Sequence, residues 1–263
     1  GGDGTTPILI PCHGMEGSSS SAYILRIMDT AARQGWRGVA FNFRTCSGHS
    51  NRLLQSYHGG FTDDLGLVVN QVAERWPGAP ILLAGYSLGG SILANWLGRS
   101  AADVPDQVQS AFICCGPTRL GPASARVDRA AFGFYSRMFL RTMKRKVQSK
   151  ADTFPGTFDN GAAQRARTLQ QFDEAYTAPV HGFSSARDYY EEASAGPCLG
   201  AIAVPLLWVG AEDDPIITAS AAPPDDFRSN PRLHQVWCRH GGHVGFSEGA
   251  RSNWLADQAV AWF

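Results

Sequence analysis

One ten-residue stretch, "LLAGYSLGGS" (residues 82–91), constrains the fold of this chain more than any other. Residues 85–89 match the pattern G-x-S-x-G, directly after an apolar run and directly before an amphipathic segment. In that context the pattern predicts a sharp strand-to-helix turn that exposes Ser87 at the carboxyl end of a strand. The amino terminus of the following helix then points at the serine, where it favours negative charge. The stretch therefore predicts a nucleophilic serine rather than an incidental glycine-rich turn.

Short apolar runs recur along the chain and indicate buried strands. They occupy residues 7–12, 38–43, 81–86, 110–115 and 205–210, and a less regular run covers 233–238. Continuous apolar runs are typical of a parallel sheet that is covered on both faces. Residues 61–76 place their apolar side chains on one helical stripe between two of these runs. The alternation predicts an α/β fold with a mostly parallel central sheet flanked by helices.

The alternation is interrupted between about residues 118 and 199. This segment is rich in helix-forming and aromatic residues and contains the basic stretch "RMFLRTMKRKVQSK" (residues 137–150). No Gly/Ser/Pro-rich linker bounds it, and the strand pattern resumes at Pro205. We expect one domain, residues 1–263, with a helical lid inserted at about 118–199.

Composition excludes several classes of function. The 263 residues carry 23 basic and 23 acidic side chains, so no basic excess indicates a nucleic-acid partner. Six cysteines in a chain of this length are no disulfide framework, and no CxxC pair indicates a zinc site. Adjacent Cys114 and Cys115 are expected to point to opposite faces of a strand. No signal peptide or membrane-spanning run is evident, which favours a cytoplasmic location.

A serine nucleophile needs a general base, and the base needs an orienting acid. For a serine in this kind of turn the expected chain order is serine, acid, histidine. The run "PLLWVGAEDDPIIT" supplies two acids after a strand. Counting from Gly210 favours Asp213, whereas the apolar "PII" that follows favours Asp214. We take Asp214 as the expected acid and Asp213 as the alternative, with the other carboxylate bonding backbone amides of the turn.

The base is sought in "CRHGGHVGF", after the last apolar run. His243, deeper in this loop, is the expected base, while His240 is the alternative and a structural neighbour. His58 precedes the serine in the chain; with Asp63 it forms an H-x4-D pattern, which we interpret as loop packing and the opening of a helix. The two loop histidines could also bind a metal, but Glu248 is the one further ligand nearby, so no metal or cofactor is expected.

The oxyanion formed during acyl transfer requires two N–H donors. The residue after the nucleophile supplies one, so the Leu88 N–H is expected there. The second is expected from the loop after the first strand, in "PCHGMEGSS", where Met15 follows a tight turn. His13 in the same loop is interpreted as a structural histidine bonded to backbone.

Several blocks together resemble the YheT-like branch of the α/β-hydrolase superfamily. They are "HGMEGSSSSAYI", "FNFRTCSGHSNRLLQSYHGGFTDDL", "GYSLGGSILANWL", "FDEAYTAPVHGFSSARDYYEEAS", "AEDDPII" and "GGHVGFSEG". The resemblance runs from about Pro7 to Phe263. It implies an α/β-hydrolase fold with a helical lid, and a triad of Ser87, Asp214 (or Asp213) and His243. It also implies hydrolysis of medium- or long-chain acyl esters, including lipids, with acyl transfer to alcohols in some members.

Two features depart from the family pattern. The sequence begins where the third strand of the family is expected, so an N-terminal hairpin and extension are not part of it. The usual "RGC" reads Arg44-Thr45-Cys46, which replaces a glycine and predicts a different loop shape.

The expected function is therefore that of a serine carboxylesterase or lipase-like hydrolase, whose partner is a small-molecule acyl ester or lipid. The alternatives are an ester-forming acyltransferase, a thioesterase or peptidase, and a ligand-binding protein without turnover. An apolar acyl pocket is expected from lid residues Phe132, Phe134, Tyr135, Met138, Phe139, Leu140 and Met143. The basic residues Arg137, Arg141, Lys144, Arg145, Lys146 and Lys150 suggest either a solvated helix face or peripheral contact with anionic lipid. The sequence leaves the oligomeric state open.

Overall fold

In the computed structural model, which describes residues 4–246 and 253–263, six parallel strands form one sheet. Their order across the sheet is β2-β1-β3-β4-β5-β6. The strands are β1 (Ile8–Cys12), β2 (Arg37–Gly38), β3 (Ile81–Tyr86), β4 (Val108–Cys114), β5 (Leu206–Ala211) and β6 (Leu233–Cys238). The predicted α/β fold with a parallel sheet is confirmed.

The second strand is much shorter than the apolar run at 38–43 predicts. Only Arg37 and Gly38 pair with β1, and one further bond runs from the Val39 N–H to the Leu9 carbonyl at 2.9 Å. Beyond that point the backbone bonds to loop side chains: the Phe43 N–H donates to His13 Nε2 at 3.1 Å. The predicted strand over 39–43 is therefore wrong, because a buried histidine replaces the neighbouring strand as hydrogen-bond partner.

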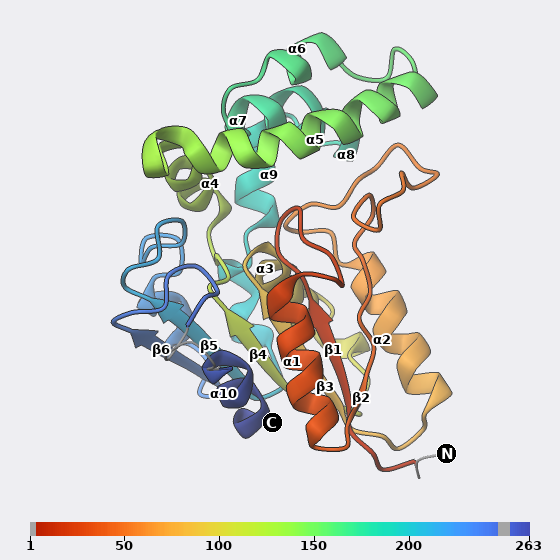
Figure 1. Ribbon diagram of the computed structural model, residues 1–263, viewed down its shortest axis with the longest axis vertical. Helices are drawn as coiled ribbons and strands as arrows, with labels where there is room; N and C mark the ends of the chain where they lie inside the picture. The colour runs from red at the N-terminus through yellow and green to blue at the C-terminus, as the bar shows by residue number, and fades with distance from the viewer. Residues whose placement is uncertain (1–3, 247–252) are drawn as a thin grey trace.

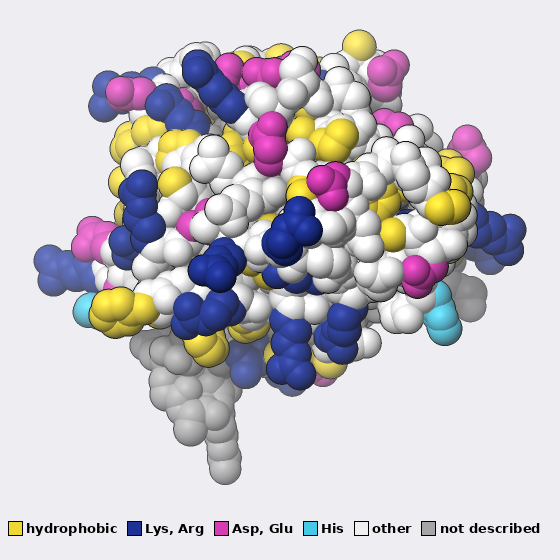
Figure 2. Space-filling model, turned by 90° about the horizontal axis from the view of Figure 1, so that it is seen from above, with side chains coloured by type: hydrophobic (Ala, Val, Ile, Leu, Met, Phe, Trp, Pro, Cys, Tyr) yellow, Lys and Arg dark blue, Asp and Glu magenta, His cyan; other side chains and the backbone are white. Residues whose placement is uncertain are grey.

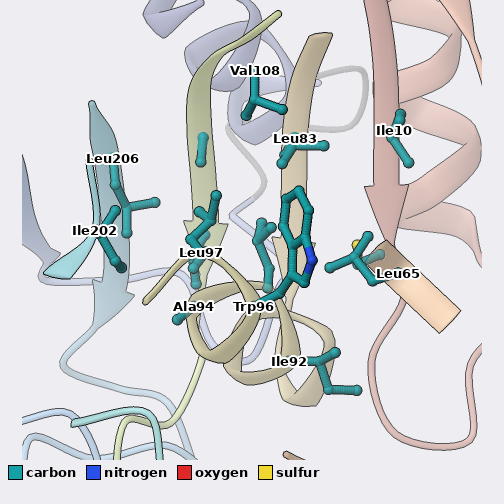
Figure 3. Packing of buried hydrophobic residues seen from close by; sticks show 14 of the residues in the cluster. Ile10, Leu65, Leu83, Ile92, Ala94, Trp96, Leu97, Val108, Ile202 and Leu206 are labelled. Carbon is teal, nitrogen blue, oxygen red and sulfur yellow. The ribbon is translucent and has the colours of Figure 1, made fainter. Parts of the chain in front are cut away.

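One face of the sheet is covered by α2 (Asp63–Arg75) and α3 (Leu88–Arg99). Figure 3 shows Trp96 of α3 next to Leu83 of the sheet, with Leu97 and Ala94 on the side toward Ile202 and Leu206. These side chains are almost fully buried, and fully burying one large apolar side chain contributes about 1.5–3 kcal/mol. Because α3 packs closely against the sheet, the position of the turn between β3 and α3 is fixed.

The opposite face is covered by α1 (Ala22–Arg33) and α10 (Trp254–Trp262), which pack against each other. Both helices lie in front of the sheet in Figure 1. Their buried residues, among them Ile24, Ile27 and Leu255, contact strand residues such as Leu9 and Phe112. The sheet is thus buried on both faces, as its continuous apolar runs predict.

The segment between β4 and β5 forms a helical layer over the carboxyl ends of the strands (Figure 1). It contains α4 (Leu120–Arg129), η2 (Ala130–Gly133), α5 (Phe134–Thr153), α6 (Asn160–Arg165), α7 (Leu169–Phe172), the π-helical η3 (Asp173–Thr177), α8 (Ala178–His181) and α9 (Ala186–Ala193). The chain then returns to the sheet through η4 (Gly196–Ala201), which packs against α3. Short 3₁₀ segments η1 (Ala101–Asp103) and η5 (Pro224–Phe227) lie outside the layer. Its buried apolar residues, among them Val127, Leu140 and Phe172, form a cluster with Ile216 and Ile217 from the loop after β5.

Over 4–246 and 253–263, the helices are too short or too polar to cross a bilayer.

Candidate active site

Ser87 lies at the junction of β3 and α3, at the carboxyl end of the sheet. Its backbone has φ 52° and ψ −126°, a conformation that costs a non-glycine residue about 1–3 kcal/mol. The surrounding bonds hold it there: the Ser87 N–H donates to the Cys114 carbonyl at 2.9 Å, and the Gly90 N–H donates to the Ser87 carbonyl at 2.9 Å. The strained turn lifts the serine hydroxyl out of the strand and toward the helical layer.

The glycines around Ser87 are required by close backbone packing. A Cβ at Gly89 would lie 2.2 Å from the His13 carbonyl oxygen, and one at Gly85 would lie 2.6 Å from the Gly90 Cα. Both distances are far below van der Waals contact with atoms of the backbone, which cannot move aside cheaply. The G-x-S-x-G spacing thus lets β3, α3 and the loop after β1 converge on one serine.

Ser87, His243 and Asp214 form a continuous chain of hydrogen bonds. His243 Nε2 lies 2.9 Å from Ser87 Oγ, and His243 Nδ1 lies 2.8 Å from Asp214 Oδ2. The Asp214 side chain is fully buried and the His243 side chain is 17% exposed. Because a carboxylate accepts only, Nδ1 donates to Asp214 and Nε2 is left to accept the serine proton. The structure brings these three residues together as a base-activated nucleophile requires.

The two adjacent aspartates differ sharply. The second oxygen of Asp214, Oδ1, accepts from the N–H groups of Ile216 and Ile217 at 2.7 and 2.9 Å, which fixes the carboxylate toward His243. Asp213 instead accepts from the Gly241 and Gly242 N–H groups at 2.9 and 2.8 Å. The bond from Gly242 is the main reason that the pKa of Asp213 lies below its usual range. Asp213 therefore shapes the histidine loop, and Asp214 contacts the histidine.

His240 does not reach the serine. Its side chain is 87% exposed, and its Nδ1 lies 3.4 Å from Asp213 Oδ2 on the surface. The suggested metal site on the two loop histidines would have needed Glu248, which lies outside the described residues.

Cys115 is a neighbour of the histidine that the sequence analysis did not single out. It follows β4 with a left-handed φ of 49°, and its Sγ lies 3.7 Å from that of Cys114. The expectation that these two cysteines point to opposite faces is therefore wrong, because Cys115 lies beyond the end of the strand. Burial of the ring lowers the pKa of His243, but hydrogen bonds with Asp214 and Cys115 outweigh burial and raise that pKa to about 9.

Cys115, Asp214 and His243 also offer three atoms within 4.8 Å of one another that could ligate a metal ion. Both ring nitrogens of His243 are already engaged, one by Asp214 and one by Ser87. The hydrogen-bonded chain accounts for this cluster, so we assign no metal to it.

The loop after β1 places Met15 between two residues whose N–H groups are bonded. The Gly14 N–H donates to Tyr23 Oη at 2.9 Å, and the Glu16 N–H donates to Tyr57 Oη at 2.7 Å. Among the residues that the structure describes, no acceptor is found for the N–H of Met15 or of Leu88. These two donors are the ones that the sequence predicts for an oxyanion, and both residues line the cavity that contains Ser87.

His13 in this loop is held by backbone partners. Its Nδ1 lies 2.8 Å from the Gly14 carbonyl oxygen, and its Nε2 accepts from the Phe43 N–H. Burial lowers the pKa of His13, which keeps the ring neutral. It thus fixes the turn before Met15, as the interpretation of a structural histidine implies.

An ion pair that sequence reasoning missed connects the helical layer to this loop. Lys146 of α5 donates to Glu16 Oε1 at 2.8 Å, and Tyr57 Oη lies 3.2 Å from the same oxygen. Glu16 has a left-handed φ of 57°. The basic character of residues 137–150 was visible in the sequence, but no local pattern indicates a partner 130 residues away.

The cavity at Ser87 is lined mainly by apolar side chains from the sheet loops and the helical layer. They are Met15, Leu88, Leu120, Ala123, Val127, Phe139, Met143, Val147, Leu169, Phe172, Ile216 and Ile217. Of the seven layer residues expected to form an acyl pocket, only Phe139 and Met143 line it. Leu140 is buried inside the layer and Tyr135 packs on it. Phe132, Phe134 and Met138 are exposed, so the expectation is wrong for them.

The H-x4-D pattern does not form a site. His58 is buried against His181, with ring centroids 4.4 Å apart, and burial lowers its pKa to about 3. Asp63 is exposed at the first position of α2. Within the described residues no hydrogen bond or ion pair joins the two side chains.

The sequence profile of the alpha/beta hydrolase fold family matches residues 7–250. The chain belongs to this family. It is 35% identical to YheT of Escherichia coli (strain K12), named as a candidate esterase, over 97% of this chain and 76% of that protein. This places it in the YheT-like branch, and it is an esterase- or lipase-like α/β hydrolase.

Other relatives share the fold. The chain is 31% identical to the mouse phospholipase ABHD3 over 93% of its own length, but it spans only 59% of that protein. Among solved structures, the esterase Pf2001 of Pyrococcus furiosus superposes with a TM-score of 0.61 at 14% identity, covering 98% of this chain and 84% of the other. At that identity the superposition supports the shared α/β-hydrolase fold alone.

Proposed function

We propose that this chain is a serine carboxylic ester hydrolase that acts on medium- or long-chain acyl esters, with Ser87, His243 and Asp214 as its catalytic triad. The observation that carries the proposal is the chain of contacts Ser87–His243–Asp214, at 2.9 and 2.8 Å. A non-catalytic binding protein would have no need for a strained serine aimed at a buried imidazole–carboxylate pair.

The geometry supports acyl transfer in two halves. Ser87 Oγ attacks the ester carbonyl carbon while His243 Nε2 takes the hydroxyl proton, and the N–H groups of Leu88 and Met15 bind the oxyanion. The alcohol leaves with the proton from His243, so that an acyl-Ser87 ester remains. Water then gives a proton to His243 and attacks the acyl carbon, and the acid is released as Ser87 regains its proton.

The substrate class is supported by the walls of the cavity. Apolar side chains from α4, α5 and α7 face Ser87, which suits an acyl chain. The charged residues on the wall already have partners: Lys146 pairs with Glu16, and Asp173 accepts from Thr177 and Tyr190. We assign the helices between β4 and β5 the role of a lid, because their inner side lines the cavity. The relatives named as an esterase and a phospholipase agree with a carboxylic ester of lipid character.

The test is the Ser87→Ala variant, measured with p-nitrophenyl esters of increasing acyl length. We expect a loss of kcat/KM of about 10⁴-fold or more, since the nucleophile is removed. Ser91→Ala is the matched control, because this buried hydroxyl lies one turn further along α3 and has no hydrogen-bond partner among the described residues. Full turnover by Ser87→Ala would refute the proposal.

Two further measurements separate the alternatives. Labelling by a fluorophosphonate that is lost in Ser87→Ala distinguishes an enzyme from a binding protein. Addition of an alcohol acceptor distinguishes hydrolysis from ester formation: a product ester that outweighs the free acid would identify an acyltransferase.

A further inference from the structure

An exposed apolar cluster lies at the start of α5, on the outer side of the helical layer. Phe132 is 99% exposed, Phe134 is 55% exposed and Met138 is 45% exposed. The other large apolar side chains with comparable exposure, Leu25, Leu53, Leu67 and Val236, are scattered over separate elements. Single exposed apolar residues need no explanation, but three within seven residues form a patch.

The backbone holds the most exposed of these side chains outward. Ala131 and Phe132 both have left-handed conformations, with φ 47° and 52°, and Gly133 follows with φ 75°. Non-glycine residues adopt this region rarely, and an uncapped turn would relax out of it. Hydrogen bonds fix the turn: Arg137 Nη1 donates to the Phe132 carbonyl at 2.9 Å, and Asp128 accepts from the Ser136 hydroxyl and from the Leu169 N–H.

In residues 129–151 the lysines make bonds within the protein, whereas the arginines are exposed. Residues 129–151 contain seven Lys or Arg and no Asp or Glu. All three lysines are used internally: Lys144 donates to the Ala166 carbonyl, Lys146 to Glu16, and Lys150 to Asn51 and Leu53. The remaining four are arginines, and all of them are exposed: Arg129, Arg137, Arg141 and Arg145.

The exposed arginines have no carboxylate partner within the part of the chain that the structure describes. Single exposed arginines elsewhere, such as Arg26 and Arg52, also have no ion pair among the described residues, whereas Arg33 and Arg187 pair with an acid four residues away. The distinguishing feature here is that four such arginines follow one another in a segment without an acid. Along α5 the outward positions Phe134, Arg137, Met138, Arg141 and Arg145 recur every three or four residues and so share one stripe. In Figure 2, which looks onto the layer from above, dark blue side chains gather with yellow ones in the lower part of the view.

We propose that the stripe from Phe132 to Arg145 docks the protein on the surface of an anionic phospholipid bilayer. The patch protrudes rather than forming a groove, so it suits a fluid interface into which Phe132, Phe134 and Met138 insert. The guanidinium groups match the fork geometry of lipid phosphates, and the absence of acids between residues 129 and 151 removes local repulsion. The inner side of α5 lines the cavity through Phe139, Met143 and Val147, so a docked bilayer lies one helix away from Ser87.

Docking does not depend on the proposed reaction and is tested without turnover. The Ser87→Ala protein is sedimented with phosphatidylcholine vesicles, with and without 30% phosphatidylglycerol. We expect binding to the anionic vesicles only. Phe132→Ser should weaken the partition coefficient about tenfold through the loss of an inserted aromatic side chain. Arg141→Glu should weaken it at least fivefold, and added salt should reduce the remaining binding.

Matched variants on another face control for net charge and exposed apolar area. Leu67→Ser removes an apolar side chain of α2 that is 59% exposed, comparable with Phe134, and Arg26→Glu reverses an exposed charge on α1. Both variants should bind as the parent protein does. In the background with Ser87 intact, Phe132→Ser and Arg141→Glu should hydrolyse p-nitrophenyl acetate at the parental rate, which shows that the fold is retained. Equal binding to neutral vesicles, equal losses in the controls, or insensitivity to Phe132→Ser would each overturn the proposal.

Discussion

The sheet edge and the helical layer above it are built by different means. At the sheet edge, Ser87, Asp214 and His243 each follow a strand, and apolar packing of the strands and α3 places them. In the layer, single polar side chains connect segments that are distant in sequence, as Lys150 does with Asn51 and Leu53. The arrangement at the sheet edge follows from a pattern of residue types along the sequence, whereas the arrangement of the layer depends on individual hydrogen bonds. Substitutions should therefore affect chemistry in one region and stability in the other.

The largest effect is expected at the histidine loop. His243→Ala removes the proposed base and should lower kcat/KM about 10⁴-fold. His240→Ala removes only an exposed contact with Asp213, and its kcat/KM should stay within twofold of the parent value because such surface pairs contribute little. Steady-state kinetics on a short p-nitrophenyl ester measure both. If the two effects came out reversed, the assignment of the base would be wrong.

The paired aspartates give a second contrast, with a pH signature. Asp214→Asn should lower kcat about 10³- to 10⁴-fold, since the imidazole loses its orientation. The Asp214 carboxylate helps to raise the pKa of His243 to about 9, and the base must be unprotonated. Activity should therefore rise as pH approaches 9. In Asp214→Asn the pKa of His243 should be lower, so the residual activity should reach its plateau at a lower pH than in the parent protein.

Asp213→Asn is the control for that experiment. The amide oxygen can still accept from Gly241 and Gly242, so the rate should change less than threefold and the pH profile should not move. The same linkage acts on stability. Because the folded pKa of His243 lies above 6.5, the pair with Asp214 stabilises the fold below about pH 6.5, and this contribution is lost as pH rises through 9.

In the layer, the expected effect is on stability. Lys150 is fully buried and donates to three oxygens of residues 51 and 53. Lys150→Met removes the charged donor from all three oxygens, although the Leu53 carbonyl keeps a bond from Asn51 Nδ2, and the free energy of unfolding should fall by about 2–4 kcal/mol. Lys144→Met, which loses a single bond to the Ala166 carbonyl, should lose about 1 kcal/mol. Denaturant unfolding compares the two; equal losses would contradict the role assigned to Lys150.

The smallest effect is expected at Thr45, where the family pattern has glycine. Its φ of 67° is left-handed, which is unfavourable for a β-branched residue. Thr45→Gly should therefore raise the free energy of unfolding by about 1 kcal/mol, since the strain exceeds the added entropy of glycine in the unfolded chain. A thermal melt detects this change, and a lower melting temperature would show that the Thr45 side chain contributes more than its backbone costs.

The sequence predicted those parts of the molecule that depend on periodicity and chain order. The apolar runs located five of the six strands well, and G-x-S-x-G followed by acid and histidine selected three side chains that the fold brings together. The sequence-based prediction was wrong where one contact or one backbone conformation determines the local structure. Residues 39–43 do not form the predicted strand because the Phe43 N–H donates to His13. Phe132 does not line the pocket because the left-handed turn at Ala131 and Phe132 directs its side chain outward.

The inward orientation of the three lysines has a practical consequence. Lys144, Lys146 and Lys150 are the only lysines in the 263 residues, and all of them lie on α5. A lysine-specific protease therefore finds its cleavage sites in this sequence on a single helix, each behind a hydrogen bond that must open first. The rate of limited digestion at these sites, followed by mass spectrometry, would time the opening of the lid without any engineered label.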